Sequence, residues 1–207
     1  MGAGEPAVDE PTPPLSATVV VPTIHGREQQ LRRAIDSVWA QTMPAALQVI
    51  LDENREGAAA TRNRALEHVT TEWVAFLDDD DILLPNHLRA CSRYARLTGV
   101  DVVYPGYEID VDDPIGCFGL DFDAELLRRR NFIPVTTLCR TEAVRAVGGF
   151  QEHPDENGDP CEDWGLWLAM LARGADFAHL AEKTWTWHIH DGQTWGVGHG
   201  ASEASVA

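Results

Sequence analysis

The sequence predicts a single α/β domain in which a mostly parallel sheet is covered by helices on both faces. In the first half of the chain, short continuous apolar runs alternate with amphipathic helical patterns, which is typical of a doubly wound sheet. The 207 residues suit one domain, and 44% hydrophobic and 24% charged residues are typical of a globular protein. Neither an internal repeat nor a linker divides the chain.

The first half predicts four strands and three helices. The strands are predicted at residues 18–21, 47–51, 73–77 and 101–104, and the helices at residues 28–40, 57–68 and 87–97. Each apolar run is a candidate buried strand, and we expect the first to stop at Pro22 because proline cannot continue a central ladder. In the first helix, Leu31, Ile35, Val38 and Trp39 fall on one helical face.

The second half is less regular and predicts a mixed-sheet extension of the same domain. Helices are predicted at residues 123–130, 142–147 and 159–173, and strands at residues 135–139 and 184–189. Residues 1–16 are rich in proline and poor in apolar side chains, so we expect a disordered leader there and a featureless tail at 201–207. The folded domain is therefore predicted to span residues 17–200.

Composition restricts the class of partner and the compartment. The formal net charge of −17 argues against a nucleic-acid-binding surface, which needs lysine and arginine, and suits a cation-attracting cleft. No apolar run is long enough to cross a membrane and no secretory signal is visible, so a cytoplasmic location is expected. The cysteines form no C-x-x-C pair and are expected to be reduced and mostly packed: Cys91, Cys117, Cys139 and Cys161.

Polar and acidic residues follow three of the predicted strands, as Pro22-Thr23, Asp52-Glu53 and Asp78–Asp81. Ligands of an open α/β sheet bind outside the carboxyl ends of the strands, so we expect these side chains to converge on one crevice. Adjacent aspartates repel one another by about 1 kcal/mol per pair even in water. A hard cation such as Mg²⁺ or Mn²⁺ relieves that repulsion, whereas a solvated acidic turn before the helix near Pro85 is the alternative interpretation.

Three further groups carry candidate chemistry. Glu162 and Asp163 begin a predicted amphipathic helix, where a carboxylate is either a general base or a partner of the helix dipole. Arg62 offers a planar fork for phosphate oxygens, with an ordinary surface arginine as the alternative. His188 and His190 project to the same side of an extended segment and either complete a metal site or pack with nearby tryptophans.

Several motifs, in this order and spacing, resemble a family 2 glycosyltransferase of the GT-A fold. They are Val19–Thr23, Ala34–Thr42, Ala59–Leu66, Phe76–Asp81, Gly148–Phe150, Glu162–Asp163 and Leu166–Leu168, and the match covers about residues 18–192. The resemblance implies a GT-A-like domain with a nucleotide-binding half at 17–104 and an acceptor half at 105–200. It also implies inverting transfer of a sugar from a nucleotide-diphosphate donor, first of all a UDP-sugar, to a hydroxyl acceptor with Mn²⁺ or Mg²⁺.

The resemblance implies roles for individual residues as well. Pro22, Thr23 and Asp52 correspond to contacts with the nucleotide base and ribose, and Arg62 corresponds to a contact with the donor phosphate. The chain departs from the family in the short connection at residues 51–57, which leads almost directly into the arginine motif.

The same resemblance implies a metal site. Asp78, Asp79 and Asp80 correspond to the D-x-D motif of the family, with Asp80 as the metal ligand and Asp78 or Asp79 near the ribose. His190, or failing that His188, corresponds to a late histidine close to the metal or diphosphate.

Asp163 corresponds to the catalytic base, and Glu162 to its acidic neighbour on the acceptor side. A single displacement needs only one base, unlike glycoside hydrolysis, where two carboxylates flank the bond.

Two other functions stay open. A nucleotidyltransferase should carry a glycine-rich, basic loop after the first strand, of which residues 23–27 are a poor version. A non-catalytic nucleotide- or carbohydrate-binding relative should bind without turnover.

Overall fold

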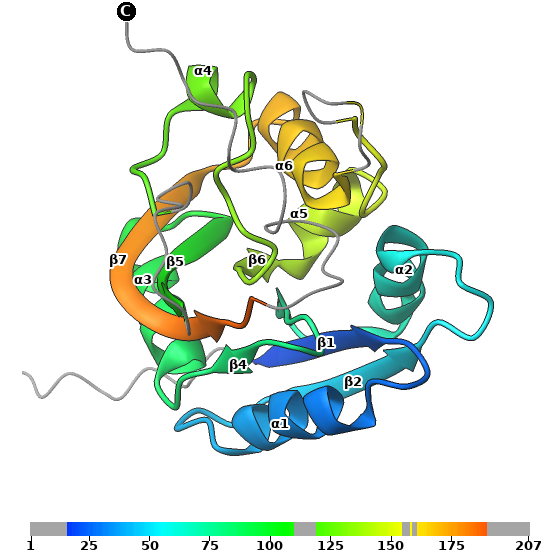
Figure 1. Ribbon diagram of the computed structural model, residues 1–207. Helices are drawn as coiled ribbons and strands as arrows, with labels where there is room; N and C mark the ends of the chain where they lie inside the picture. Colours follow the sequence, from blue (N-terminus) through cyan, green and yellow to red (C-terminus); the bar gives the residue numbers. More distant parts are fainter. Residues whose placement is uncertain (1–15, 110–118, 155–157, 159–160, 190–207) are drawn as a thin grey trace, which may run out of the picture.

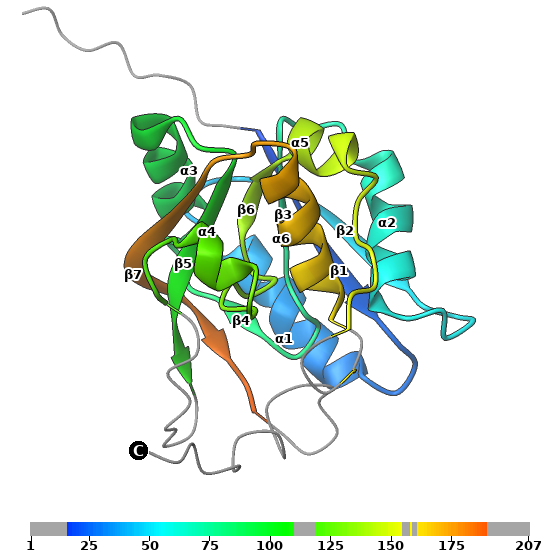
Figure 2. The ribbon, with the colours of Figure 1, turned by 90° about the horizontal axis from the view of Figure 1, so that it is seen from above.

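The computed structural model describes residues 16–109, 119–154, 158 and 161–189. Figures 1 and 2 show the chain from two directions. The strands are β1 (Ala17–Thr23), β2 (Ala46–Leu51), β3 (Trp73–Phe76), β4 (Ile82–Leu83), β5 (Val102–Ile109), β6 (Leu138–Arg140) and β7 (Phe177–Trp187). The helices are α1 (Glu28–Trp39), α2 (Ala58–His68), α3 (His87–Thr98), α4 (Ala124–Leu127), α5 (Thr141–Ala146) and α6 (Glu162–Ala172).

The strands form one 7-stranded sheet in the order β2-β1-β3-β6-β5-β7-β4. Strands β1, β2, β3, β5 and β7 run in one direction, while β6 is antiparallel to β3 and β5, and β4 is antiparallel to β7. The sheet is therefore mostly parallel with a mixed half, as the sequence predicts.

Helices cover both faces of this sheet. Helices α1 and α3 contribute to one buried apolar cluster, and α2, α5 and α6 contribute to the other. Figure 1 shows α1 below the strands β1 and β2 and the helices α2, α5 and α6 above them. The predicted doubly wound α/β domain is confirmed.

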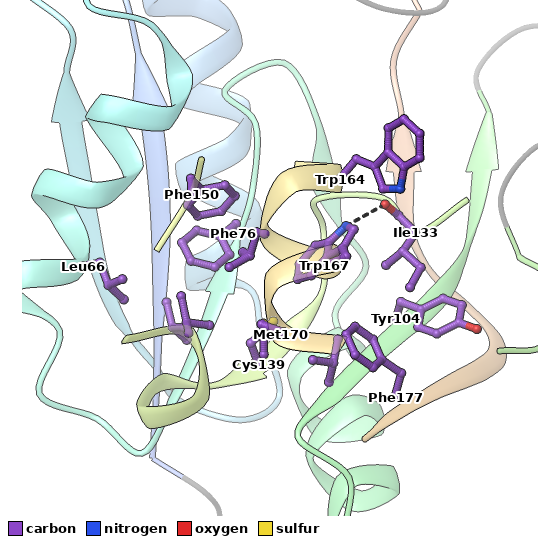
Figure 3. Close-up of a cluster of buried hydrophobic side chains, with 14 of the residues drawn as sticks. Leu66, Phe76, Tyr104, Ile133, Cys139, Phe150, Trp164, Trp167, Met170 and Phe177 are labelled. Carbon is purple, nitrogen blue, oxygen red and sulfur yellow. Dashed lines mark hydrogen bonds between the residues drawn. The ribbon is translucent and has the colours of Figure 1, made fainter. Parts of the chain in front are cut away.

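Two tryptophans fix helix α6 against the mixed half of the sheet (Figure 3). Trp167 is fully buried, and its indole N–H donates to the Ile133 carbonyl at 3.0 Å. The indole N–H of Trp164 donates to the Leu127 carbonyl at 2.7 Å. Because a buried indole needs such a partner, these bonds set the orientation of the helix and thus the position of its first turn.

Three predicted details of the first half are wrong. Strand β1 continues through Pro22, because its pairing with β3 ends at Val20 while its pairing with β2 continues, so the proline has a strand on one side only. Strand β2 is the edge of the sheet and is only partly buried. Val38 is buried in helix α1, but Trp39 is 66% exposed at the end of that helix.

The end of the chain holds more strand than predicted. Strand β7 begins at Phe177, and β5 continues to Ile109, so that the two pair along their length with an irregularity at Gly106. A Cβ on Gly106 would lie 3.0 Å from the Ala181 carbonyl oxygen, so the close approach of the two backbones there needs glycine. Strand β4 was not predicted, and it attaches the segment after β3 to the end of β7.

Cys91, Cys139 and Cys161 are free and buried, as expected, whereas Cys117 lies outside the described residues. Among the helices of the described ranges, none has the length and apolar character needed to cross a bilayer.

Candidate active site

A cavity of about 350 Å³ lies at the carboxyl ends of β1, β2 and β3. Nine of the described residues that the sequence singled out for the site line it: Pro22, Thr23, Asp52, Arg62, Asp78, Asp79, Asp80, Glu162 and Asp163. His188 does not line it. The expected convergence on one crevice is therefore observed. His190 lies outside the described residues.

The aspartate run forms a tight turn between β3 and β4. The backbone N–H of Asp81 donates to the Asp78 carbonyl at 3.1 Å, and β4 then pairs with β7 at once. Asp78, Asp80 and Asp81 each present a carboxylate oxygen, and these oxygens lie within 4.8 Å of one another. Three convergent carboxylates are the kind of ligand set that Mg²⁺ and Mn²⁺ accept. Asp81 was not among the predicted ligands.

Asp79 is not one of these three residues, and its side chain bonds to residues at and after the end of β1. Its carboxylate accepts the Thr23 hydroxyl proton at 2.6 Å and a guanidinium N–H of Arg27 at 2.8 Å. The same Arg27 nitrogen lies 3.1 Å from the Asp80 carboxylate. Burial alone would lower the pKa of Arg27, but the hydrogen bond and charge of Asp79 outweigh it and raise that pKa. Arg27 thus joins the loop after β1 to the aspartate turn.

Helix α1 holds the segment that follows the aspartates. The Ser37 hydroxyl oxygen accepts the Leu83 N–H at 3.1 Å. The Gln41 side-chain amide donates to the Leu84 carbonyl at 2.7 Å and accepts the Leu88 N–H at 3.0 Å. Ser37 and Gln41, both in the motif Ala34–Thr42, therefore have a structural role in holding this segment.

Asp52 closes the short connection between β2 and α2. Its two carboxylate oxygens accept the backbone N–H groups of Glu56 and Gly57, each at 2.9 Å. Burial would raise the pKa of Asp52, but these two bonds lower it below its ordinary value. The carboxylate turns the chain directly into α2, which explains how the chain manages with a shorter connection than its resemblance suggests.

Asp163 lies in the first turn of α6 with an unusual charge environment. One carboxylate oxygen accepts the Trp164 N–H at 2.7 Å and the Cys161 thiol proton at 3.2 Å. Burial and the neighbouring charge of Glu162 raise the pKa of Asp163 to about 6, although Arg62 and the two hydrogen bonds oppose this rise. A carboxyl group with a pKa near 6 is well matched to proton transfer close to neutral pH.

Tryptophans of β7 form another wall of the cavity. Trp185 and Trp187 both line it, and the Tyr107 ring lies 5.5 Å and 6.1 Å from their rings. The backbone N–H of His188 donates to the Asp81 carboxylate at 3.0 Å. The end of β7 therefore reaches the aspartate turn through the backbone of His188.

Sequence reasoning missed several residues that line the cavity, namely Arg27, Asp81, Asn131, Thr136 and Cys161. Asp81 belongs to the run already noticed, and Arg27 follows the first strand closely, so both carried a usable signal. Asn131 and Thr136 lie in an irregular stretch between α4 and β6, where no periodic pattern marks them.

Residues 45–116, about a third of the chain, match the family model described as glycosyl transferase family 2. The amylovoran biosynthesis glycosyltransferase AmsE of Erwinia amylovora is 26% identical over 176 residues, which cover 81% of this chain and 63% of the relative. The succinoglycan biosynthesis protein ExoW of Rhizobium meliloti (strain 1021) is 31% identical over 134 residues, covering 46% of this chain and 41% of the relative.

Solved structures share the fold. S. aureus TarS 1-349 in complex with UDP-GlcNAc has a TM-score of 0.69 at 16% identity, covering 87% of this chain and 60% of that one. The mannosyltransferase PcManGT from Pyrobaculum calidifontis in complex with GDP-Man and Mn²⁺ has a TM-score of 0.65 at 17% identity, covering 88% and 59%. The chain thus spans less than two thirds of the length of these proteins. Residues 45–116 thus resemble glycosyl transferase family 2, the chain as a whole is similar to a biosynthetic glycosyltransferase, and it shares its fold with TarS and PcManGT.

Proposed function

We propose that the chain transfers a sugar from a nucleotide-diphosphate sugar to an acceptor hydroxyl, with inversion at the anomeric carbon and with Mn²⁺ or Mg²⁺. One observation carries the proposal: the aspartate turn and a carboxyl group with a pKa of about 6 face the same cavity. The relative AmsE is a glycosyltransferase, and the structures of similar fold hold UDP-GlcNAc or GDP-Man.

The donor is proposed to bind across the ends of β1, β2 and β3. Pro22, Thr23 and Asp52 line the cavity there and are the proposed neighbours of the base and ribose. The Thr23 hydroxyl donates to Asp79, and the Asp52 carboxylate accepts two backbone N–H groups, so internal hydrogen bonds hold both side chains in fixed positions at the cavity wall. A UDP-sugar is the first donor to test and a GDP-sugar the second.

The oxygens of Asp78, Asp80 and Asp81 fit a divalent cation. They come from one tight turn and lie within 4.8 Å of one another, and a hard cation prefers such ligands. When bound, the cation neutralises the charge that develops on the departing diphosphate. His188 lies beside Asp81, and His190 keeps its proposed role near the diphosphate although it lies outside the described residues.

Asp163 is the proposed catalytic base. As the acceptor oxygen attacks the anomeric carbon, its hydroxyl proton passes to the Asp163 carboxylate, whose raised pKa favours proton uptake. Glu162 pairs with Arg62 at 2.6 Å, so it is held away from the role of a second nucleophile. One available base favours a single displacement, and a single displacement inverts the anomeric centre.

The proposal is tested by following the nucleotide product. The protein is incubated with UDP-glucose, UDP-GlcNAc or GDP-mannose, with Mn²⁺ and a panel of methyl glycosides as acceptors. We expect release of nucleoside diphosphate with at least one donor, and Asp163→Asn should reduce that release by about 100-fold or more. The exposed Asp36→Asn variant is the control and should keep the wild-type rate. Release of pyrophosphate would indicate a nucleotidyltransferase, and donor binding without turnover would indicate a binding module.

A further inference from the structure

Arg62 is a buried cation that joins two distant parts of the site. It lies on α2, its side chain is 3% exposed, and its guanidinium carbon lies 5.3 Å from the centre of the Phe150 ring. One terminal nitrogen donates to Glu162 at 2.6 Å, and the other donates to Asp78. Glu162 begins helix α6, whereas Asp78 follows strand β3, so a single side chain connects these two elements.

Glu162 and Asp78 each accept one N–H from a terminal nitrogen of Arg62, and their charges offset that of the guanidinium, so Arg62 is already committed to two carboxylates. Burial alone would lower the pKa of Arg62, but the charges of Asp78 and Glu162 outweigh it and raise that pKa. Removing one member of a buried ion pair leaves an uncompensated charge, which is strongly destabilising. The existing pairs therefore compete with the donor-phosphate contact that the resemblance implies.

The position of Asp163 depends on the same residues. Asp163 follows Glu162 in the first turn of α6, and the first turn of a helix moves as a unit. Arg62 holds Glu162 toward Asp78, and Asp78 is one of the three convergent aspartates. Arg62 thus links the first turn of α6, which the two tryptophan bonds already orient, directly to the aspartate turn.

We propose that Arg62 is a positioning residue, which tethers the helix of the base to the aspartate turn, and that it does not bind the donor phosphate. This inference rests on the proposed function for its effect on transfer. The tether itself is a property of the folded chain. Arg62 acts through Glu162 and Asp78, and its charge also opposes the rise that Glu162 causes in the pKa of Asp163.

The test compares Arg62→Lys with Arg64→Lys. Both residues lie on α2, but Arg64 pairs with the exposed Glu56 at 2.5 Å and does not line the cavity. A lysine at position 62 keeps the positive charge yet cannot bridge two carboxylates in a fork. Thermal melts of both variants, with wild type, confirm folding first.

If Arg62 is a positioning residue, its replacement should lower the turnover rate and leave the affinity for nucleotide nearly unchanged. Arg62→Lys should bind UDP or GDP with Mn²⁺ within about threefold of wild type, and its turnover should fall by about 100-fold, because small misplacement of a base has effects of that size. Arg64→Lys should leave both unchanged. A loss of tenfold or more in nucleotide affinity, with an unchanged rate at saturating donor, would show that Arg62 binds phosphate and would overturn the inference.

A second measurement does not need transfer activity. The carboxyl ¹³C signal of Asp163 is titrated in wild type, Arg62→Gln and Glu162→Gln. Because Arg62→Gln removes the positive charge that opposes the rise, we expect an upward movement of the Asp163 titration in that variant and a downward movement in Glu162→Gln. An unmoved titration in Arg62→Gln would reject the link between Arg62 and Asp163 even if no donor is ever turned over. Inactive wild type with the expected movement would instead reject the proposed function alone.

Discussion

Replacing Asp163 by asparagine should make the protein more stable while it removes the proposed base. The carboxyl group of Asp163 has its pKa raised from 3.8 to about 6, chiefly by burial and secondly by Glu162. A carboxyl group whose pKa is raised by folding binds its proton more tightly in the folded state than in the unfolded state. Its ionisation therefore destabilises the fold, with the full penalty above pH 6, and the penalty disappears as the pH falls toward 4. Each pKa unit corresponds to about 1.4 kcal/mol, so the penalty at pH 7.5 is about 3 kcal/mol.

Asparagine removes the charge and keeps an oxygen that can accept the Trp164 N–H and the Cys161 thiol proton. The free energy of unfolding of Asp163→Asn should therefore exceed that of wild type by up to about 3 kcal/mol at pH 7.5 and by about half of that at pH 5. For a chain of this size, a gain of that magnitude raises the melting temperature by about 6–12 °C.

Urea denaturation at pH 5.0 and pH 7.5 measures the difference. Asp36→Asn, on the exposed side of α1, is the control and should change the free energy by no more than about 0.5 kcal/mol at either pH. A variant less stable than wild type at pH 7.5, or an equal gain at both pH values, would refute the reasoning.

Three other predictions follow from the site. The rate of sugar transfer should fall tenfold for each pH unit below about 6, because Asp163 must be ionised to accept a proton, and a pH profile that stays flat down to pH 5 would contradict this. Asp80→Ala should lose the Mn²⁺-dependent rise in melting temperature that UDP or GDP causes, whereas the exposed Asp36→Ala should keep it; an unchanged rise would remove Asp80 from the metal site. Gly165→Ala should destabilise the fold by about 1–3 kcal/mol in urea denaturation, because a Cβ at this position would clash with the Gln151 carbonyl oxygen. This clash outweighs the roughly 1 kcal/mol by which alanine favours a helix over glycine. A variant as stable as wild type, or more stable, would show that the loop around Gln151 moves to make room.

The parts of the fold that the sequence predicted well are those with strong local patterns. The apolar run that became β3 and the helix that became α2 each carry their signal within a few consecutive residues. The position of the cavity was also predictable, because the carboxyl ends of neighbouring parallel strands meet at one edge of a sheet.

The parts that were missed depend on partners far away in the chain. Strand β4 has two residues and exists because it pairs with Thr186 and Trp185 of β7, about a hundred residues later. The exposure of Trp39 is likewise decided by where the helix ends on the sheet, and the apolar pattern alone does not reveal that end. Such features arise from tertiary packing, so a local window of sequence contains no signal for them.

The same limit applies to the roles of charged side chains. The sequence identified the aspartate run as a candidate cation site, but its four members have different contacts: three carboxylates converge, and Asp79 bonds to Thr23 and Arg27. Likewise, the sequence identified Arg62 as important, yet only the structure pairs it with Glu162, which lies a hundred residues away. Residue type and spacing locate such a site, whereas hydrogen-bond partners decide which of its members remain available to a ligand.

The charges of the cavity wall argue for a cation in any reaction that uses a diphosphate there. Seven acidic residues line the described part of the wall against two arginines: Asp52, Asp78, Asp79, Asp80, Asp81, Glu162 and Asp163 face Arg27 and Arg62. Both arginines already pair with these carboxylates. A diphosphate that entered alone would therefore meet repulsion in a site that is partly shielded from water, where charges interact more strongly. A divalent cation held by the aspartates would offset that repulsion, so the acidic wall suits the proposal that a cation and an anionic donor bind together.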